Sequence, residues 1–104
     1  MKTFKDLKFK NNKMGGVGSS HTFDNGLTIS VQASKGHYCS PREDLNSEDK
    51  YSSFEVAIID KENNFVTAEF ILDALDSVIG WQSKEEINKI IKEILEEVKN
   101  YTYL

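Results

Sequence analysis

A glycine-rich segment is the first candidate for chemistry in this sequence. Gly15-Gly16-Val17-Gly18 is followed by two serines, and its backbone N–H groups have little side-chain cover. Such groups bind phosphate when successive ones point into one concavity, and nearby Lys13 and His21 would assist. The segment is not a Walker loop, because no Lys-Ser or Lys-Thr pair follows and the next element is a predicted strand. A flexible connector is the alternative interpretation.

Arg42 is the only arginine of the chain and comes directly after Ser40 and Pro41. A guanidinium binds phosphate or carboxylate through paired hydrogen bonds and also stacks on aromatic rings. Because Glu43 and Asp44 follow, a surface ion pair is an equally good interpretation of Arg42.

Aromatic and acidic residues near loops supply the other groups that a nucleotide-like ligand requires. Phe23, Tyr38, Tyr51, Trp81 and Tyr101 are candidates for stacking, although such residues more often form the rim of a core. A carboxylate such as that of Asp76 can accept hydrogen bonds from a ribose. We therefore predict a ligand site from nine residues: Gly15, Gly16, Gly18, His21, Phe23, Tyr38, Ser40, Arg42 and Asp76.

His37 and Cys39, with His21 as a further candidate, have the residue types of a metal site or of a nucleophile and its base. Structural zinc requires four ligands, so we expect no metal and no cofactor. A lone cysteine is more often a small buried apolar group than a nucleophile. We therefore expect a protein without enzymatic activity, and a small hydrolase that uses Cys39 and a histidine is an alternative.

The elements that position these residues are a sheet followed by a helix. Short alternating runs predict an antiparallel sheet of about five or six strands. Asn25-Gly26 predicts a type I′ hairpin turn, residues 40–53 a long polar loop, and Thr3 to Asp6 one capped helical turn. The strand-forming segments lie at 8–10, 21–23, 27–33, 54–59 and 65–70, with a strand or a bend at 37–39.

The C-terminal segment predicts one amphipathic helix. Ser83 and Glu86 have the spacing of a capping box, and six aliphatic residues then recur at helical spacing: Ile87, Ile90, Ile91, Ile94, Leu95 and Val98. We expect an α+β fold in which this helix covers the sheet. The 104 residues form a single domain, with residues 1–70 mainly β, 71–82 a connector and 83–100 the helix.

The net charge of −4 conceals an asymmetry along the chain. Residues 1–42 hold seven basic and two acidic residues, whereas residues 43–104 hold six basic and fifteen acidic ones. Solvated faces of opposite sign are one interpretation, and a basic face for an anionic partner is another. The overall acidity argues against nucleic-acid binding. A single cysteine, no signal-like N-terminus and no long apolar run predict a cytoplasmic protein that does not enter a membrane.

Three segments, residues 21–26, 37–42 and 76–86, resemble the first Thoeris anti-defence family of phages and prophages. The resemblance covers size, order of elements and general character, and it carries over no binding residue. Members bind a cyclic ADP-ribose isomer made by a TIR-domain enzyme and withhold it from its effector. The resemblance implies a homodimer or higher oligomer that sequesters this signal, uncleaved, in the cytosol of the host bacterium.

The acidic half of the chain permits another function. A small phage inhibitor, comparable to an anti-CRISPR protein, would bind a bacterial defence protein directly through that acidic surface.

Overall fold

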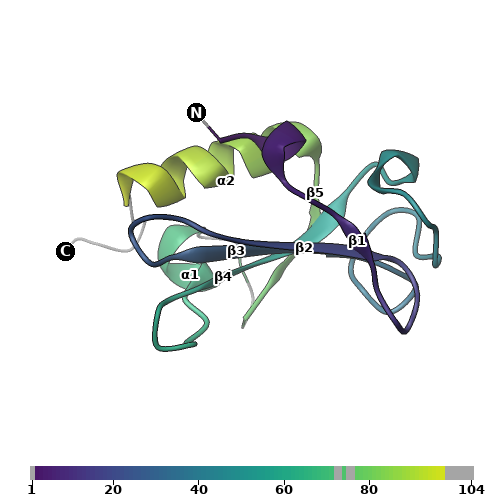
Figure 1. The fold of residues 1–104 in the computed structure, drawn as a ribbon, viewed down its shortest axis with the longest axis horizontal. Coiled ribbons are helices and arrows are strands. Elements are labelled where there is room, and N and C mark those ends of the chain that lie inside the picture. Colours follow the sequence, from purple (N-terminus) through teal and green to yellow (C-terminus); the bar gives the residue numbers. More distant parts are fainter. Residues whose placement is uncertain (1, 72–73, 75–76, 98–104) are drawn as a thin grey trace.

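The computed structural model describes residues 2–71, 74 and 77–97. Its described strands form one antiparallel sheet in which the spatial order equals the order in the sequence. Helix α2 (Lys84–Glu96) and the short helix η1 (Phe4–Asp6) lie across one side of this sheet (Figure 1). The predicted α+β fold is therefore confirmed. The strands are β1 (Lys10–Asn11), β2 (Val17–Thr22), β3 (Thr28–Ala33), β4 (Phe54–Ile59) and β5 (Ile79–Gln82).

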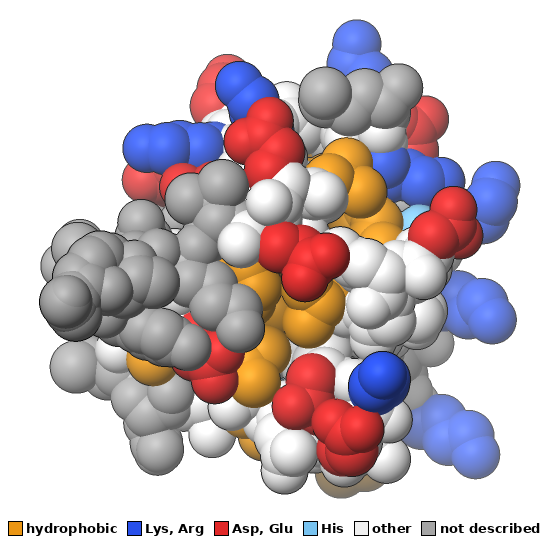
Figure 2. Space-filling view, turned by 90° about the vertical axis from the view of Figure 1, so that its left-hand side faces the viewer, with side chains coloured by type: hydrophobic (Ala, Val, Ile, Leu, Met, Phe, Trp, Pro, Cys, Tyr) orange, Lys and Arg blue, Asp and Glu red, His pale blue; other side chains and the backbone are white. Residues whose placement is uncertain are grey.

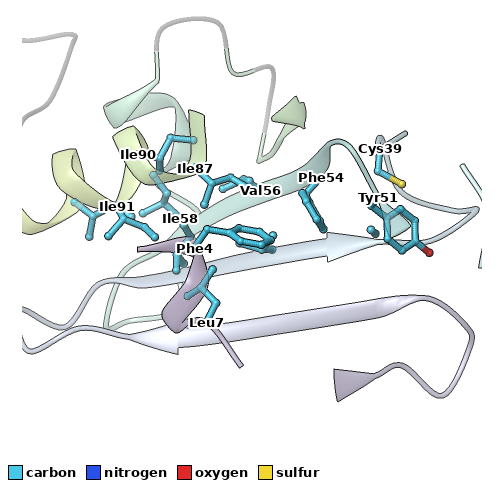
Figure 3. Packing of buried hydrophobic residues seen from close by; sticks show 14 of the residues in the cluster. Phe4, Leu7, Cys39, Tyr51, Phe54, Val56, Ile58, Ile87, Ile90 and Ile91 are labelled. Atoms are coloured by element: carbon cyan, nitrogen blue, oxygen red, sulfur yellow. The ribbon is translucent and has the colours of Figure 1, made fainter. Parts of the chain in front are cut away.

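The core lies between α2 and one face of the central strands. Ile29 and Val31 of β3 stand opposite Ile58 and Val56 of β4, and all four are fully buried. The helix adds Ile87, Ile90, Ile91 and Ile94, which the helical spacing predicted. Figure 3 shows the first three of these beside Val56 and Ile58. Leu95 departs from that prediction because it is 41% exposed, and Val98 lies outside the described residues.

Helix α2 begins with the predicted capping box. Ser83 Oγ accepts from the Glu86 N–H, and the Glu86 carboxylate accepts from the Ser83 N–H at 2.8 Å. The helix ends at Glu96, earlier than predicted, because Glu97 has a left-handed backbone with φ 52°. Residues 98–100 of the predicted helix lie outside the described part of the chain.

The first helical turn is also confirmed. The Thr3 N–H donates to the Asp6 carboxylate at 2.9 Å, and the Phe4 N–H donates to Asn88 Oδ1 of α2 at 2.7 Å. The predicted 8–10 strand shifts to β1, since only Lys10 and Asn11 pair with β2, and the Phe9 ring instead packs against Phe4 and Phe54.

The β2–β3 turn differs from the predicted type I′ turn. The Phe23 N–H donates to Leu27 O, the Gly26 N–H donates to Phe23 O, and Gly26 has a positive φ of 89° whereas Asn25 does not. This is a three-residue connection, a type I turn followed by a glycine bulge. The Asn25 side chain explains the difference: it accepts from the Leu27 N–H and donates to Ile94 O of α2.

The predicted strand at residues 65–70 is wrong. Phe65 makes one bridge to Ile59, and the chain then turns into helix α1 (Thr67–Phe70). The Thr67 hydroxyl accepts from the Ile58 N–H and donates to Ser77 O. The Ile58 N–H of β4 therefore bonds a side chain and not the backbone of a neighbouring strand. The neighbour of β4 is instead β5, which lies within the predicted 71–82 connector.

Candidate functional site

Three exposed planar groups form a stack at one end of the sheet. The rings of Tyr38 and Trp81 have centroids 5.3 Å apart and are inclined by 31°. The Arg42 guanidinium carbon lies 5.4 Å from the Tyr38 ring centroid. Tyr38 is 46% exposed and Trp81 is 53% exposed, so both rings remain available to a ligand. We call Tyr38, Trp81 and Arg42 the aromatic cluster.

Hydrogen bonds hold the backbone of Trp81 beside that of Tyr38. The Trp81 N–H donates to Tyr38 O at 2.9 Å, and the Tyr38 N–H donates to a Glu55 carboxylate oxygen at 3.1 Å. Gly80 permits this approach, because a Cβ there would lie 2.6 Å from the Tyr38 Cβ. The cluster therefore depends on β5 being a strand and on a glycine directly before the tryptophan.

Trp81 has an unusual backbone conformation for a large side chain. Its φ is 55°, in the left-handed region, which costs of the order of 1–3 kcal/mol for a residue other than glycine. The side chain recovers little of this by packing, since it is half exposed. Gly80 and Trp81 together face one β4 residue, Glu55, so this backbone conformation belongs to a β-bulge in β5. Bulges are frequent beside functional sites, where they redirect a side chain, so Trp81 is a candidate functional residue.

The loop that carries Arg42 is folded around a buried tyrosine. The Tyr51 hydroxyl donates to Glu43 O at 2.6 Å and accepts from the Leu45 N–H at 2.8 Å. The ring is 3% exposed, and burial raises the pKa of Tyr51. A bridge between Ser40 and Ser53 closes the loop. Figure 3 shows Tyr51 beyond Phe54, at the end of the core.

The glycine segment forms the β1–β2 hairpin turn. The Gly15 N–H donates to Asn12 O, and the Asn12 N–H donates to Gly16 O. Both glycines have positive φ, and a Cβ on Gly15 would lie 2.6 Å from the Asp44 carboxylate. A phosphate beside Gly15 would therefore meet a negative charge, and one of the N–H groups is already bonded.

A hollow of about 480 Å³ lies beside this turn, lined in part by Lys13, Gly15, Lys35, His37 and Asp44. Its volume falls within the range of ligand pockets. Two lysines oppose one aspartate there, and the Asp44 carboxylate already accepts from the Lys35 N–H at 3.0 Å. The hollow can receive an anion at its lysine side.

The structure brings some of the predicted site residues together and separates others. Tyr38 and Arg42 are in contact, and Gly15 lies against the loop that carries Arg42. Gly18 is inside β2, where a Cβ would collide with the Gln32 side chain. Ser40 is in the bridge that closes its loop.

His21 and Phe23 lie at the far end of β2 from the glycine turn. Their rings are 4.8 Å apart and nearly perpendicular, and Phe23 is buried in the core cluster. Asp76 lies outside the described residues.

Trp81 was not among the predicted site residues, because an isolated tryptophan is more often part of a core rim. The preceding Gly80 was the one signal in the sequence that another backbone approaches closely there.

Cys39 is covered by the chain around it. It is 1% exposed, and its Sγ donates to Ser34 O at 3.2 Å. Burial raises the pKa of the Cys39 thiol, so it stays protonated at neutral pH. His37 Nδ1 hydrogen-bonds the Ser34 hydroxyl at 2.7 Å. This arrangement gives no support to the hydrolase alternative.

Metal binding and membrane crossing are two further functions that the described residues bear on. No group of three or more His, Cys, Asp or Glu side chains in this part of the chain is arranged to hold a metal ion. No described helix combines the length and the apolar character that crossing a bilayer requires.

Comparison of the chain with family models, with curated proteins and with solved structures gave no match.

Proposed function

We propose that this protein binds a nucleotide signal, a cyclic ADP-ribose isomer made by a TIR-domain enzyme, and withholds it without cleaving it. The single observation that carries the proposal is the aromatic cluster, in which two half-exposed rings stand beside the only arginine. A nucleotide combines a planar base with phosphates, and the cluster offers a partner for each.

The base would stack on Tyr38 or Trp81. Stacking of a base on an aromatic side chain contributes about 1–3 kcal/mol per base and does not depend on which base it is. The ring of Trp81 already packs against the ring of Tyr38, with centroids 5.3 Å apart, so little side-chain entropy is lost on binding.

Arg42 would bind a phosphate, because a guanidinium on the face of a ring is pre-oriented for paired hydrogen bonds. The hollow that holds Lys13 and Lys35 is lined by Asp44, two residues beyond Arg42, and would take a second anionic group. The protonated, covered thiol of Cys39 fits binding without turnover.

The test is calorimetric titration with a panel of cyclic ADP-ribose isomers and cyclic dinucleotides. Trp81→Ala and Arg42→Ala should each weaken binding by about 5- to 150-fold, which corresponds to about 1–3 kcal/mol. Phe65→Ala is the matched control, since Phe65 is 56% exposed and belongs to a different turn. Its affinity should equal that of the parent protein.

Three outcomes contradict the proposal. Flat titrations against the whole panel would remove it. Ligand recovered as a cleaved product after denaturation would favour the hydrolase alternative. A host protein that the chain captures from lysate and releases at high salt, with no ligand bound, would favour the inhibitor that binds through its acidic surface.

A further inference from the structure

Strand β2 is longer than the strand that borders it. β1 pairs with β2 only through Lys10 opposite Gly18 and Asn11 opposite Val17. β2 continues to Thr22 and stays paired with β3 along its whole length. Among the described strands, residues 19–22 of β2 therefore have a neighbour on one side only.

The backbone groups on this open edge can be assigned from the printed bonds. Because the Phe23 N–H donates to Leu27 O, the residues that exchange bonds with β3 within 19–22 are Ser19 and His21. The N–H and C=O groups of Ser20 and Thr22 then point away from β3. Both residues are exposed. Strand β1 begins at Lys10, opposite Gly18, so it does not extend along residues 19–22.

The open edge lies in a basic groove. A hollow of about 690 Å³ follows it, and four lysines and one aspartate are among its lining residues. The lysines are Lys2, Lys8, Lys10 and Lys13, and the aspartate is Asp6. The Asp6 carboxylate caps η1 by accepting from the Thr3 N–H. Figure 2 shows basic side chains gathered along its right-hand side, while acidic ones spread over the face toward the viewer.

We propose that the edge of β2 at residues 19–22 binds an extended acidic peptide as an added strand. Unpaired N–H and C=O groups give affinity for any extended backbone. Lysines beside an edge discourage pairing with neutral or basic strands. The same four lysines favour a strand whose side chains are carboxylates, so charge selects the partner. The proposal concerns a different surface from the aromatic cluster and does not depend on the nucleotide ligand.

The probe is a short fluorescein-labelled peptide of alternating glutamate and valine, followed by fluorescence anisotropy. Lys8→Glu combined with Lys10→Glu should weaken binding by about tenfold or more, equivalent to at least about 1.4 kcal/mol. The matched control is Lys50→Glu combined with Lys61→Glu, which makes the same charge change at two exposed lysines outside the groove. The control should bind like the parent protein, and equal weakening in both would overturn the proposal.

A second pair of measurements separates strand addition from simple charge attraction. Ser20→Pro removes an outward N–H group that the sheet does not use, so circular dichroism should report a folded protein while peptide binding is lost. The same peptide methylated on alternate backbone nitrogens keeps its charge and should not bind. Equal binding of the methylated peptide would overturn the proposal. So would an oligothymidylate that binds more tightly than the peptide with the same dependence on Lys8 and Lys10.

Discussion

The covered face of the sheet and the aromatic cluster treat large apolar side chains in opposite ways. Beneath α2 the side chains of Ile29, Val56 and Ile58 are fully buried. In the cluster, Tyr38 and Trp81 keep about half of their surface in solvent, and the backbone of Trp81 is strained. Burial of apolar surface organises the first region. In the second, a backbone hydrogen bond between Trp81 and Tyr38 holds two rings that remain half exposed to water.

The largest effect is expected at the covered face. Ile91→Ala should lower the free energy of unfolding by about 2–5 kcal/mol, because it leaves a cavity beneath a fully buried residue of α2. Leu95→Ala, on the same helix but 41% exposed, should cost about 0.5 kcal/mol. Urea denaturation measures both. Equal losses would show that α2 does not pack through its isoleucine stripe.

Tyr51 connects the two regions, and its hydroxyl tests how firmly the Arg42 loop is held. Tyr51→Phe should lower the free energy of unfolding by about 1–3 kcal/mol, because Glu43 O and the Leu45 N–H both lose their partly buried hydrogen-bond partner. Tyr38→Phe removes a hydroxyl from a half-exposed ring and should leave the unfolding free energy unchanged. If the two variants are equally stable in urea denaturation, Tyr51 does not organise the loop.

The same contrast explains which features were predictable from the sequence. Periodicity identified α2, its capping box and the segments of β3 and β4, since each depends on residues near one another in the chain. At the candidate site, residue types selected Tyr38 and Arg42, which the structure places in contact, and that they bind a ligand stays a prediction. Trp81 was not selected, because its partner lies in a distant segment and local spacing carries no record of it.

The errors have the same origin. Residues 65–70 alternate like a strand, but the Thr67 hydroxyl binds the β4 backbone and the segment turns into α1. Asn25-Gly26 has the dipeptide of a type I′ turn, but the Asn25 side chain donates to Ile94 O of a helix far along the chain. In each case a tertiary hydrogen bond outweighed a local preference.

Trp81→Asn sharpens the comparison, because stability and binding should respond differently. Asparagine tolerates the left-handed backbone, so relief of strain should offset the lost ring contact with Tyr38. The unfolding free energy should stay within about 1 kcal/mol of the parent value, while nucleotide affinity falls as for Trp81→Ala. Thermal unfolding and calorimetric titration measure the two. A loss of more than about 2 kcal/mol would make Trp81 an ordinary packing residue.

The smallest effect concerns Asp60, in the turn that follows β4. Its carboxylate accepts from the Asn64 and Glu62 N–H groups, and the first of these bonds contributes most to lowering the pKa of Asp60 from 3.8. A lowered pKa stabilises the fold above the unfolded-state value, and that stabilisation is lost as pH falls through the folded-state value. The parent protein and Asp60→Asn should therefore differ in the free energy of unfolding by a constant amount near neutral pH, and this difference should disappear below about pH 4. Glu62→Gln removes a charge from the same turn but leaves the Asp60 bonds intact, so urea denaturation should show no such closing. A gap that persists in acid would mean that the turn depends on side-chain shape and not on the carboxylate charge.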